Sequence, residues 1–103
     1  MTGKQKGSLK TSDDIRDLIL KLHPDIKKKI KEGFRAIIKN PDAGKKLQDE
    51  LSGLRSFRVG KYRIIYRIEK SKTILVLVIG PRRTIYEETL KLIKKNPPGK
   101  LTS

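Results

Sequence analysis

The sequence predicts an α+β domain in which an N-terminal helical hairpin packs on an antiparallel sheet and a C-terminal helix follows. Apolar residues recur at helical spacing twice before residue 40, which indicates two amphipathic helices. Three short β-rich runs then lie between residues 54 and 80, separated only by Gly60-Lys61 and Lys70-Ser71-Lys72. Short linkers of this kind are typical of antiparallel hairpins. A last, weaker helical stripe comes after the runs.

The first helix is expected to begin after Ser12, a good N-cap residue whose next two residues are acidic. His23-Pro24 ends it, because the residue before a proline avoids the α region, and Pro24 suits the first turn of a second helix. Asn40–Gly44 ends the second helix, and Lys45–Leu51 is expected to hold a short helical turn. The two apolar stripes consist of Ile15, Leu18, Ile19 and Leu22, and of Ile26, Ile30, Phe34, Ile37 and Ile38.

The β-rich runs are Leu54–Val59, Tyr62–Glu69 and Thr73–Gly80. Gly60 suits the first central position of a type II′ turn, and a two-residue turn there pairs the first two runs. The third run is apolar throughout, which is expected of a central strand covered on both sides. The runs therefore predict a three-stranded meander.

The middle strand has two different faces, because side chains alternate along a strand. Tyr62 and Ile64 point to an apolar face, on which we expect the helices. Arg63 and Arg67 point the other way, together with Arg58 and Ser56 of the first strand.

Pro81 ends the third strand, and Thr84 is expected to cap a final helix that runs to about Lys95. Residues 12–95 are therefore expected to form a single domain. Residues 1–11 form a basic arm or a weak edge strand around Gln5–Lys10, and residues 96–103 form a tail.

The charge of the chain is strongly unbalanced. Its 103 residues include 26 Lys and Arg but 11 Asp and Glu, which gives a net charge of +15. Self-repulsion at this density is relieved by a polyanion, so nucleic acid, an acidic protein or both are the expected partners. No run has the length and hydrophobicity of a membrane span, and the absence of cysteine excludes disulfides and thiolate metal sites. We expect a cytoplasmic protein that does not bind membranes.

Several cations are expected to meet at one end of the sheet. The third strand delivers Arg82 and Arg83 next to the end of the middle strand that carries Arg63, and Tyr86 lies just beyond. Guanidinium groups bind phosphate oxygens through two parallel hydrogen bonds. The cluster therefore favours a phosphate-bearing ligand.

The helical hairpin, followed by NPDAGKKL, LRSFRVGKYRIIYRI and VLVIGPRRTIY, resembles the RelE/ParE superfamily of type II toxin–antitoxin toxins. The resemblance covers roughly residues 11–95, and its most specific part is RVGKYRIIY followed by IGPRRTIY. It implies a small RelE-like α+β fold with an N-terminal strand paired in the sheet. That strand would come from about Gln5–Lys10, which departs from the usual apolar pattern.

The RelE-like branch implies a metal-independent endoribonuclease without a cofactor, acting on messenger RNA in the ribosomal A site. The resemblance assigns catalysis to Arg63, Arg82 and Tyr86, with Arg83 possible in place of Arg82. It also implies an acidic, RelB-like antitoxin as a partner, besides messenger RNA and the ribosome. The expected RNA-binding residues are Arg55, Arg58, Arg83 and Lys61.

Cleavage of RNA by its own 2′-hydroxyl needs a proton acceptor and neutralisation of charge on the phosphorane. Arg63 and Arg82 suit the second task. Tyr86 either accepts the 2′-hydroxyl proton, helped by nearby cations that favour the phenolate, or stacks on a base. His23 and Glu69 lie elsewhere on the predicted fold, and the general acid stays unassigned.

Two other functions remain open. ParE-like members of the superfamily inhibit DNA gyrase and generally lack the Arg/Tyr set, so Arg63, Arg82 and Tyr86 favour the RelE-like branch. A basic nucleic-acid-binding module without enzymatic activity is the third reading.

Overall fold

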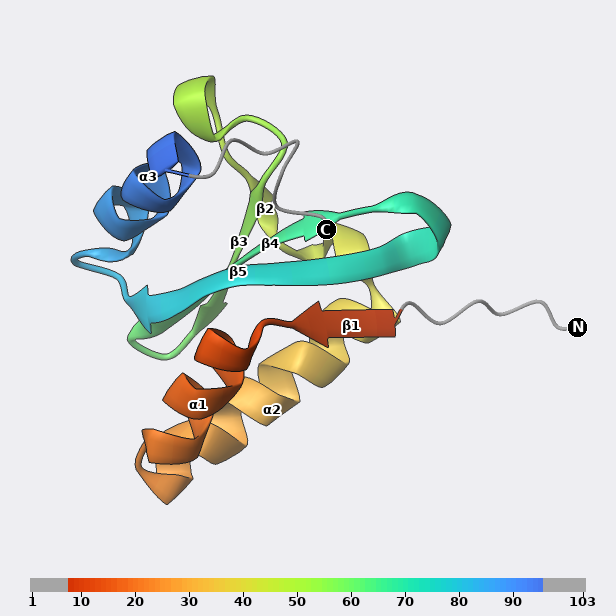
Figure 1. Ribbon diagram of the computed structural model, residues 1–103. Coiled ribbons are helices and arrows are strands. Elements are labelled where there is room, and N and C mark those ends of the chain that lie inside the picture. Colours follow the sequence, from red (N-terminus) through yellow and green to blue (C-terminus); the bar gives the residue numbers. More distant parts are fainter. Residues whose placement is uncertain (1–7, 96–103) are drawn as a thin grey trace, which may run out of the picture.

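A computed structural model describes residues 8–95, in which helices cover both faces of a five-stranded sheet (Figure 1). Residues 1–7 of the expected arm at residues 1–11, and the expected tail at residues 96–103, lie outside the described residues. The strand order is β1-β5-β4-β3-β2. The strands are β1 (Ser8–Thr11), β2 (Lys45–Lys46), β3 (Arg55–Val59), β4 (Tyr62–Ile68) and β5 (Thr73–Pro81).

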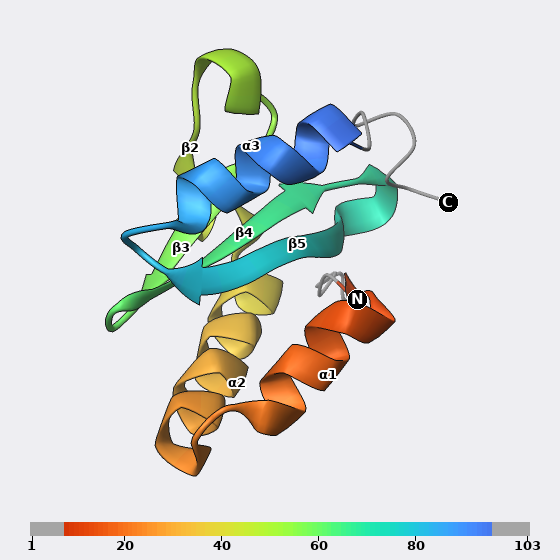
Figure 2. The same cartoon turned by 60° about the vertical axis from the view of Figure 1, so that its left-hand side comes forward.

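The helical hairpin is confirmed. Helix α1 (Asp13–Lys21) begins after Ser12, whose hydroxyl accepts a hydrogen bond from the backbone N–H of Ile15 at 3.2 Å. Helix α2 (Pro24–Lys39) follows at once, and the two helices lie side by side against one face of the sheet (Figure 2). Their buried isoleucines and the Tyr62/Ile64 face of the sheet form the larger core, with Ile30, Ile37, Ile64 and Tyr66 among its buried members.

The β3–β4 hairpin has the predicted register. Val59 pairs with Tyr62 and Phe57 with Ile64. Gly60 has a φ of +60°, as the first central residue of a type II′ turn requires, and Lys61 keeps a negative φ. This register places Arg58 directly opposite Arg63.

Strand β5 lies between β1 and β4 and contains a bulge. Ile65 pairs with Val78 and Tyr66 with Val76, so Leu77 is the extra residue on β5. After the bulge, Gly80 is opposite Arg63 and Pro81 is opposite Tyr62. The end of β5 therefore reaches the turn end of the β3–β4 hairpin.

Helix α3 (Ile85–Lys95) lies on the face of the sheet opposite to α1 and α2 (Figures 1 and 2). The expectation that the helices share the Tyr62/Ile64 face is therefore wrong for this one. The physical reason is a second core: Ile65 and Leu54 point away from α1 and α2, and the fully buried Ile85 covers them. Without α3, these apolar side chains would face water.

The two edges of the sheet differ from the prediction in detail. The N-terminal edge strand exists at β1, but it pairs parallel with β5, from Ser8 opposite Thr73 to Thr11 opposite Val76. The sheet is therefore mixed rather than wholly antiparallel. At the other edge, the short helical turn expected within Lys45–Leu51 is present as a 3₁₀ turn at Asp49–Leu51, and Lys45–Lys46 before it forms β2, a strand that was not expected.

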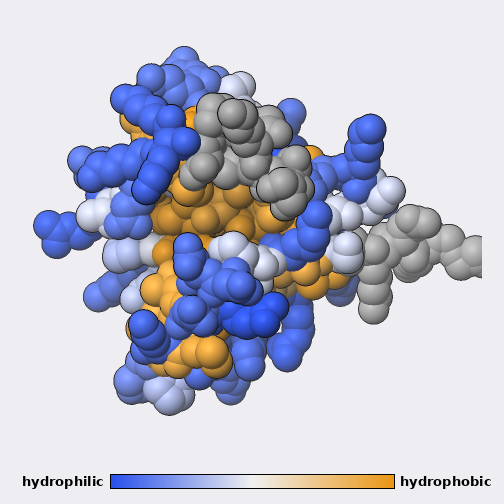
Figure 3. All heavy atoms as spheres, viewed as in Figure 1, coloured by the Kyte–Doolittle hydropathy of each residue, from blue (hydrophilic) through white to orange (hydrophobic). Residues whose placement is uncertain are grey.

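The surface of the molecule is not uniformly polar. In the view of Figure 1, an apolar area lies near the middle of the surface, among many hydrophilic residues (Figure 3). Among the helices of residues 8–95, none combines the length and the hydrophobicity that crossing a membrane would require.

Candidate active site

Arg58 and Arg63 form a directly opposed pair of cations at the turn end of the β3–β4 hairpin. Both project to the α3 side of the sheet, because Ile65, two residues after Arg63, packs in the core under α3. Arg63 is half-buried, and its guanidinium contacts no hydrogen-bonding or charged partner among the described residues. Like charges opposite one another destabilise a sheet. An anion between these two side chains would remove that repulsion.

The chain that leaves β5 brings more cations to the same end. The backbone N–H of Arg82 donates to the carbonyl of Lys61 at 3.0 Å, so Arg82 lies beside the β3–β4 turn. Arg83 follows it in the turn that leads to α3. The side chains of Arg82, Arg83 and Lys61 are exposed, and within residues 8–95 none of them forms an ion pair.

Tyr86, the second residue of α3, reaches across the sheet to β3. Its hydroxyl lies 3.3 Å from the Oγ of Ser56, which is only 3% exposed. Ser56 is two residues before Arg58 on the same face of β3. Tyr86 itself remains 37% exposed. The phenol therefore lies on the same face of the sheet as the Arg58/Arg63 pair and is accessible to a ligand.

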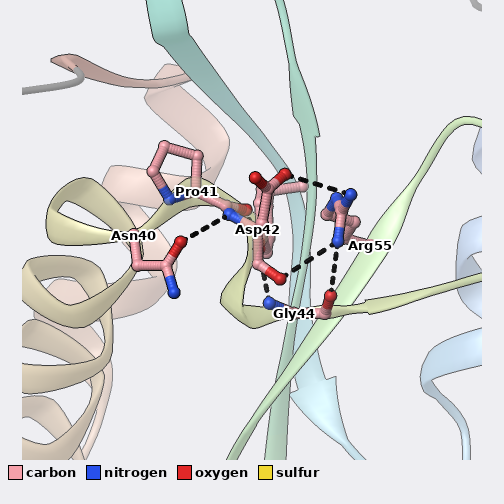
Figure 4. A network of polar contacts seen from close by, with 6 residues as sticks. Asn40, Pro41, Asp42, Gly44 and Arg55 are labelled. Atoms are coloured by element: carbon pink, nitrogen blue, oxygen red, sulfur yellow. Dashed lines mark hydrogen bonds and ion pairs between the residues drawn. The ribbon is translucent and has the colours of Figure 1, made fainter.

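Arg55 does not join these residues. It is three positions from Arg58 on β3, so its side chain projects to the opposite face of the sheet. Its guanidinium donates to the carbonyls of Asp42 (3.1 Å) and Gly44 (2.8 Å) and forms an ion pair with the Asp42 carboxylate at 3.1 Å (Figure 4). The Arg55 side chain therefore binds the loop that follows α2, away from the other residues of the expected RNA-binding set.

The same loop is held by Tyr66. The hydroxyl of Tyr66 donates to the carbonyl of Pro41 at 2.6 Å and accepts from the N–H of Gly44 at 2.9 Å. Burial raises the pKa of Tyr66 above its ordinary value. A Cβ on Gly44 would lie 2.5 Å from the Tyr66 hydroxyl, so this position has no room for a side chain.

His23 and Glu69 lie away from the candidate site, as expected. His23 caps α2 by accepting a hydrogen bond at Nδ1 from the N–H of Asp25. Glu69 lies at the far end of β4, where it pairs with Arg67 at 2.9 Å and with Lys10 at 3.4 Å. The hydrogen bond from Arg67 is the main reason why the pKa of Glu69 is lowered.

Sequence reasoning did not identify Ser56 or Glu88 as neighbours of the candidate site residues. Alternation placed Ser56 on the correct face, but nothing in the sequence indicated its contact with Tyr86. Glu88 has the sequence signal of an acidic residue in the first turn of a helix. Its position over Gly80 follows only from the fold.

The arrangement has the chemistry of a phosphate-binding surface. Cations from β3, β4 and the β5–α3 connection gather at one end of the sheet, and a phenol hydroxyl lies on the same sheet face as Arg58 and Arg63. Among the described residues, no three His, Cys, Asp or Glu side chains gather in a way that would hold a metal ion.

Fold and sequence together define the class of protein. The sequence model of the ParE toxin of the type II toxin–antitoxin system parDE matches residues 8–86. The chain therefore belongs to the RelE/ParE superfamily of toxins of type II toxin–antitoxin systems. No curated protein matches the chain in sequence.

Similar solved structures are RelE toxins, alone or with their antitoxins. The toxin–antitoxin complex RelBE2 of Mycobacterium tuberculosis contains a chain that is 31% identical, with a TM-score of 0.67 over 75% of this chain and 99% of that one. The archaeal RelE–RelB complex of Pyrococcus horikoshii gives 23% identity and a TM-score of 0.63, covering 75% and 96%. A mutant of E. coli toxin RelE in the free state gives 19% identity and a TM-score of 0.68, covering 85% and 98%.

Proposed function

We propose that the protein is a RelE-like toxin that cleaves messenger RNA in the ribosomal A site and thereby inhibits translation. The observation that carries the proposal is the opposed Arg58/Arg63 pair, with Tyr86 on the same face of the sheet. Arg63 is half-buried without a partner in the described residues. A half-buried guanidinium that lacks a partner within the protein is suited to binding the phosphate of a ligand.

The proposed cleavage uses the 2′-hydroxyl of the RNA as nucleophile and needs no metal ion. Arg63 and Arg82 stabilise the charge that develops on the phosphorane, because each guanidinium donates two hydrogen bonds to phosphate oxygens. Arg58, Lys61 and Arg83 bind the flanking phosphates and attract the message electrostatically. The side chain of Arg82 is chosen over that of Arg83 because its backbone is fixed to the turn at Lys61.

The proposed protein partner is an acidic antitoxin similar to RelB. Relatives in the solved structures are bound to RelB antitoxins. A chain with a net charge of +15 and an apolar area on its surface fits a partner that is both acidic and amphipathic (Figure 3). Because it acts on ribosomes, the toxin would work in the cytoplasm.

Inhibition of DNA gyrase is the second candidate, since the matching family bears the ParE name. It does not account for a phenol on the same sheet face as Arg63, whose guanidinium has no partner among residues 8–95, which is why we favour cleavage of RNA. A nucleic-acid-binding module without activity is the third candidate, and it likewise gives no role to Tyr86.

One experiment separates the three candidates. Purified protein is added to a translating extract, and the 5′ ends of the message are mapped by primer extension, while gyrase supercoiling is followed in parallel. The proposal expects new ends within codons that are absent with Arg82→Ala and with Tyr86→Phe. Inhibited supercoiling with an intact message would support the ParE-like function. Salt-sensitive RNA binding without either effect would support the binding module.

A further inference from the structure

Glu88 of α3 lies over strand β5 next to the candidate site. A Cβ built on Gly80 would lie 3.5 Å from the Oε1 of Glu88 and 3.3 Å from the Cδ1 of Ile85. Because Ile85 packs in the core under α3, this space is on the α3 side of the sheet. The missing side chain at Gly80 therefore leaves room for a carboxylate against the strand.

Gly80 is the cross-strand partner of Arg63. Paired residues have their Cβ positions about 5 Å apart, so the carboxylate of Glu88 lies beside the Arg63 side chain. Within residues 8–95, no ion pair joins Glu88 and Arg63. The carboxylate is thus near the expected phosphate site without neutralising the guanidinium.

Glu88 and Tyr86 lie over the strands on either side of β4: Gly80 under Glu88 is directly opposite Arg63, whereas Ser56 beside Tyr86 is opposite Ile65, two residues along β4. The Tyr86 hydroxyl contacts Ser56 on β3, whereas the Glu88 carboxylate lies over Gly80 on β5. Strand β4, which carries Arg63, runs between these two strands. Two strand spacings separate β3 from β5, about 10 Å. Along the strands, the phenol contact is offset from Arg63 by two residues, about 7 Å, which the long arginine side chain spans. A phosphate held by the Arg63 guanidinium would therefore have the carboxylate toward β5 and the phenol toward β3.

In-line transfer needs this kind of arrangement, since the attacking and leaving oxygens lie on opposite sides of the phosphorus. A carboxylate is ionised at neutral pH and accepts a proton, whereas a phenol still carries one to donate. The two groups therefore divide the two proton transfers between them.

Resting on the proposed ribonuclease function, we propose that Glu88 is a catalytic residue that accepts the proton of the attacking 2′-hydroxyl, while Tyr86 protonates the leaving oxygen. The 2′-oxygen forms a bond to phosphorus, and the bond from phosphorus to the 5′-oxygen breaks. The proton of the 2′-hydroxyl passes to Glu88, and the phenol proton passes to the 5′-oxygen. The products are a 2′,3′-cyclic phosphate and a 5′-hydroxyl.

Glu87 provides a matched control. Both glutamates are exposed and lie in the first turn of α3, where acidic residues stabilise the helix through its dipole. Glu87→Gln and Glu88→Gln therefore remove the same charge from the same helix turn. The structure places only Glu88 over Gly80.

The first test measures single-turnover cleavage of a message in the A site of programmed ribosomes. Glu88→Gln is expected to slow cleavage by about 100-fold, within the usual range for a general base, and Glu87→Gln by less than about twofold. Ribosome binding is measured with both variants to separate occupancy from chemistry. Equal rates for Glu88→Gln and wild type would overturn the assignment, while cleavage by the wild type would still support the ribonuclease function. No cleavage by the wild type would instead reject the ribonuclease function itself.

The second test assigns the direction of each proton transfer. In a message whose scissile 5′-oxygen is replaced by sulfur, the leaving thiolate needs no proton. This substrate is expected to restore cleavage by Tyr86→Phe to within about threefold of wild type, but not cleavage by Glu88→Gln. Restoration of Glu88→Gln would overturn its role as proton acceptor, and failure to restore Tyr86→Phe would overturn the role of the phenol as donor.

Discussion

The hydroxyl of Tyr86 lies 3.3 Å from the Oγ of Ser56, although 30 positions separate the two residues in the chain. Ser56 is buried on β3, and Tyr86 is half-exposed on α3. This contact holds the phenol over the sheet face that carries the Arg58/Arg63 pair. The orientation of a proposed catalytic group thus depends on a serine that does not itself face solvent.

Ser56→Ala is expected to slow cleavage of the message by about tenfold, corresponding to a lost hydrogen bond of about 1.4 kcal/mol that orients Tyr86. The free energy of unfolding in urea should fall by no more than about 1.5 kcal/mol, because alanine fills the same small space. Ser52→Ala, at an exposed serine, serves as the control. Unchanged cleavage by Ser56→Ala would show that Tyr86 is oriented without this contact.

Arg55→Ala is expected to lower the free energy of unfolding by about 2 kcal/mol, because it removes two hydrogen bonds and an ion pair from the loop at Asp42–Gly44. At a temperature where the variant is folded, its cleavage rate should match the wild type, since Arg55 is on the other face of the sheet. Urea unfolding and single-turnover cleavage measure the two effects. Arg35→Ala, at an exposed arginine of α2, is the stability control. A stable but inactive Arg55→Ala would return this residue to the RNA-binding set.

Stability should depend on pH through Glu69, whose pKa is lowered from 4.5, mainly by the hydrogen bond from Arg67. In the unfolded chain Glu69 binds a proton at higher pH than in the folded protein. The carboxylate therefore stabilises the fold above about pH 4.5, and this stabilisation is lost as the pH falls through the lower, folded-state pKa. Urea unfolding from pH 7 to pH 3 should show wild type more stable than Glu69→Gln at neutral pH, with the difference shrinking below about pH 4.5. A difference that does not depend on pH would contradict this role of the carboxylate.

Most of the sheet was predictable because its signals are local. Alternation along β4 and the Gly60-Lys61 turn predicted the pairing of Phe57 with Ile64, and the structure has this register. The bulge at Leu77 was not predictable, since Val76, Leu77 and Val78 are all apolar and show no alternation. The parallel pairing of β1 has no local signal either, because its partner lies 65 positions away at Thr73.

The placement of the candidate site was predictable in part. The convergence of the β5 end on Arg63 follows from the meander, and the structure brings Arg82 to the turn at Lys61. The same alternation puts Arg55 on the opposite face from Arg58, which the family resemblance alone did not take into account. The neighbours of Tyr86 and Glu88 depend on the side of the sheet that α3 covers. The second core, in which Ile85 packs on Ile65, determines which face α3 covers, and these two residues are separated in the sequence.

Arg63 is proposed to hold the scissile phosphate through its planar guanidinium, and Arg63→Lys tests this role most directly. Lysine keeps the charge but donates no bidentate pair of hydrogen bonds. Arg16 is an exposed residue of α1, which lies on the opposite face of the sheet. Arg16→Lys therefore makes the same chemical change away from the site and serves as the control. Single-turnover cleavage of messenger RNA on programmed ribosomes should fall by about 100-fold with Arg63→Lys and by less than about twofold with Arg16→Lys. Cleavage by Arg63→Lys at the wild-type rate, with the fold intact by circular dichroism, would contradict the account.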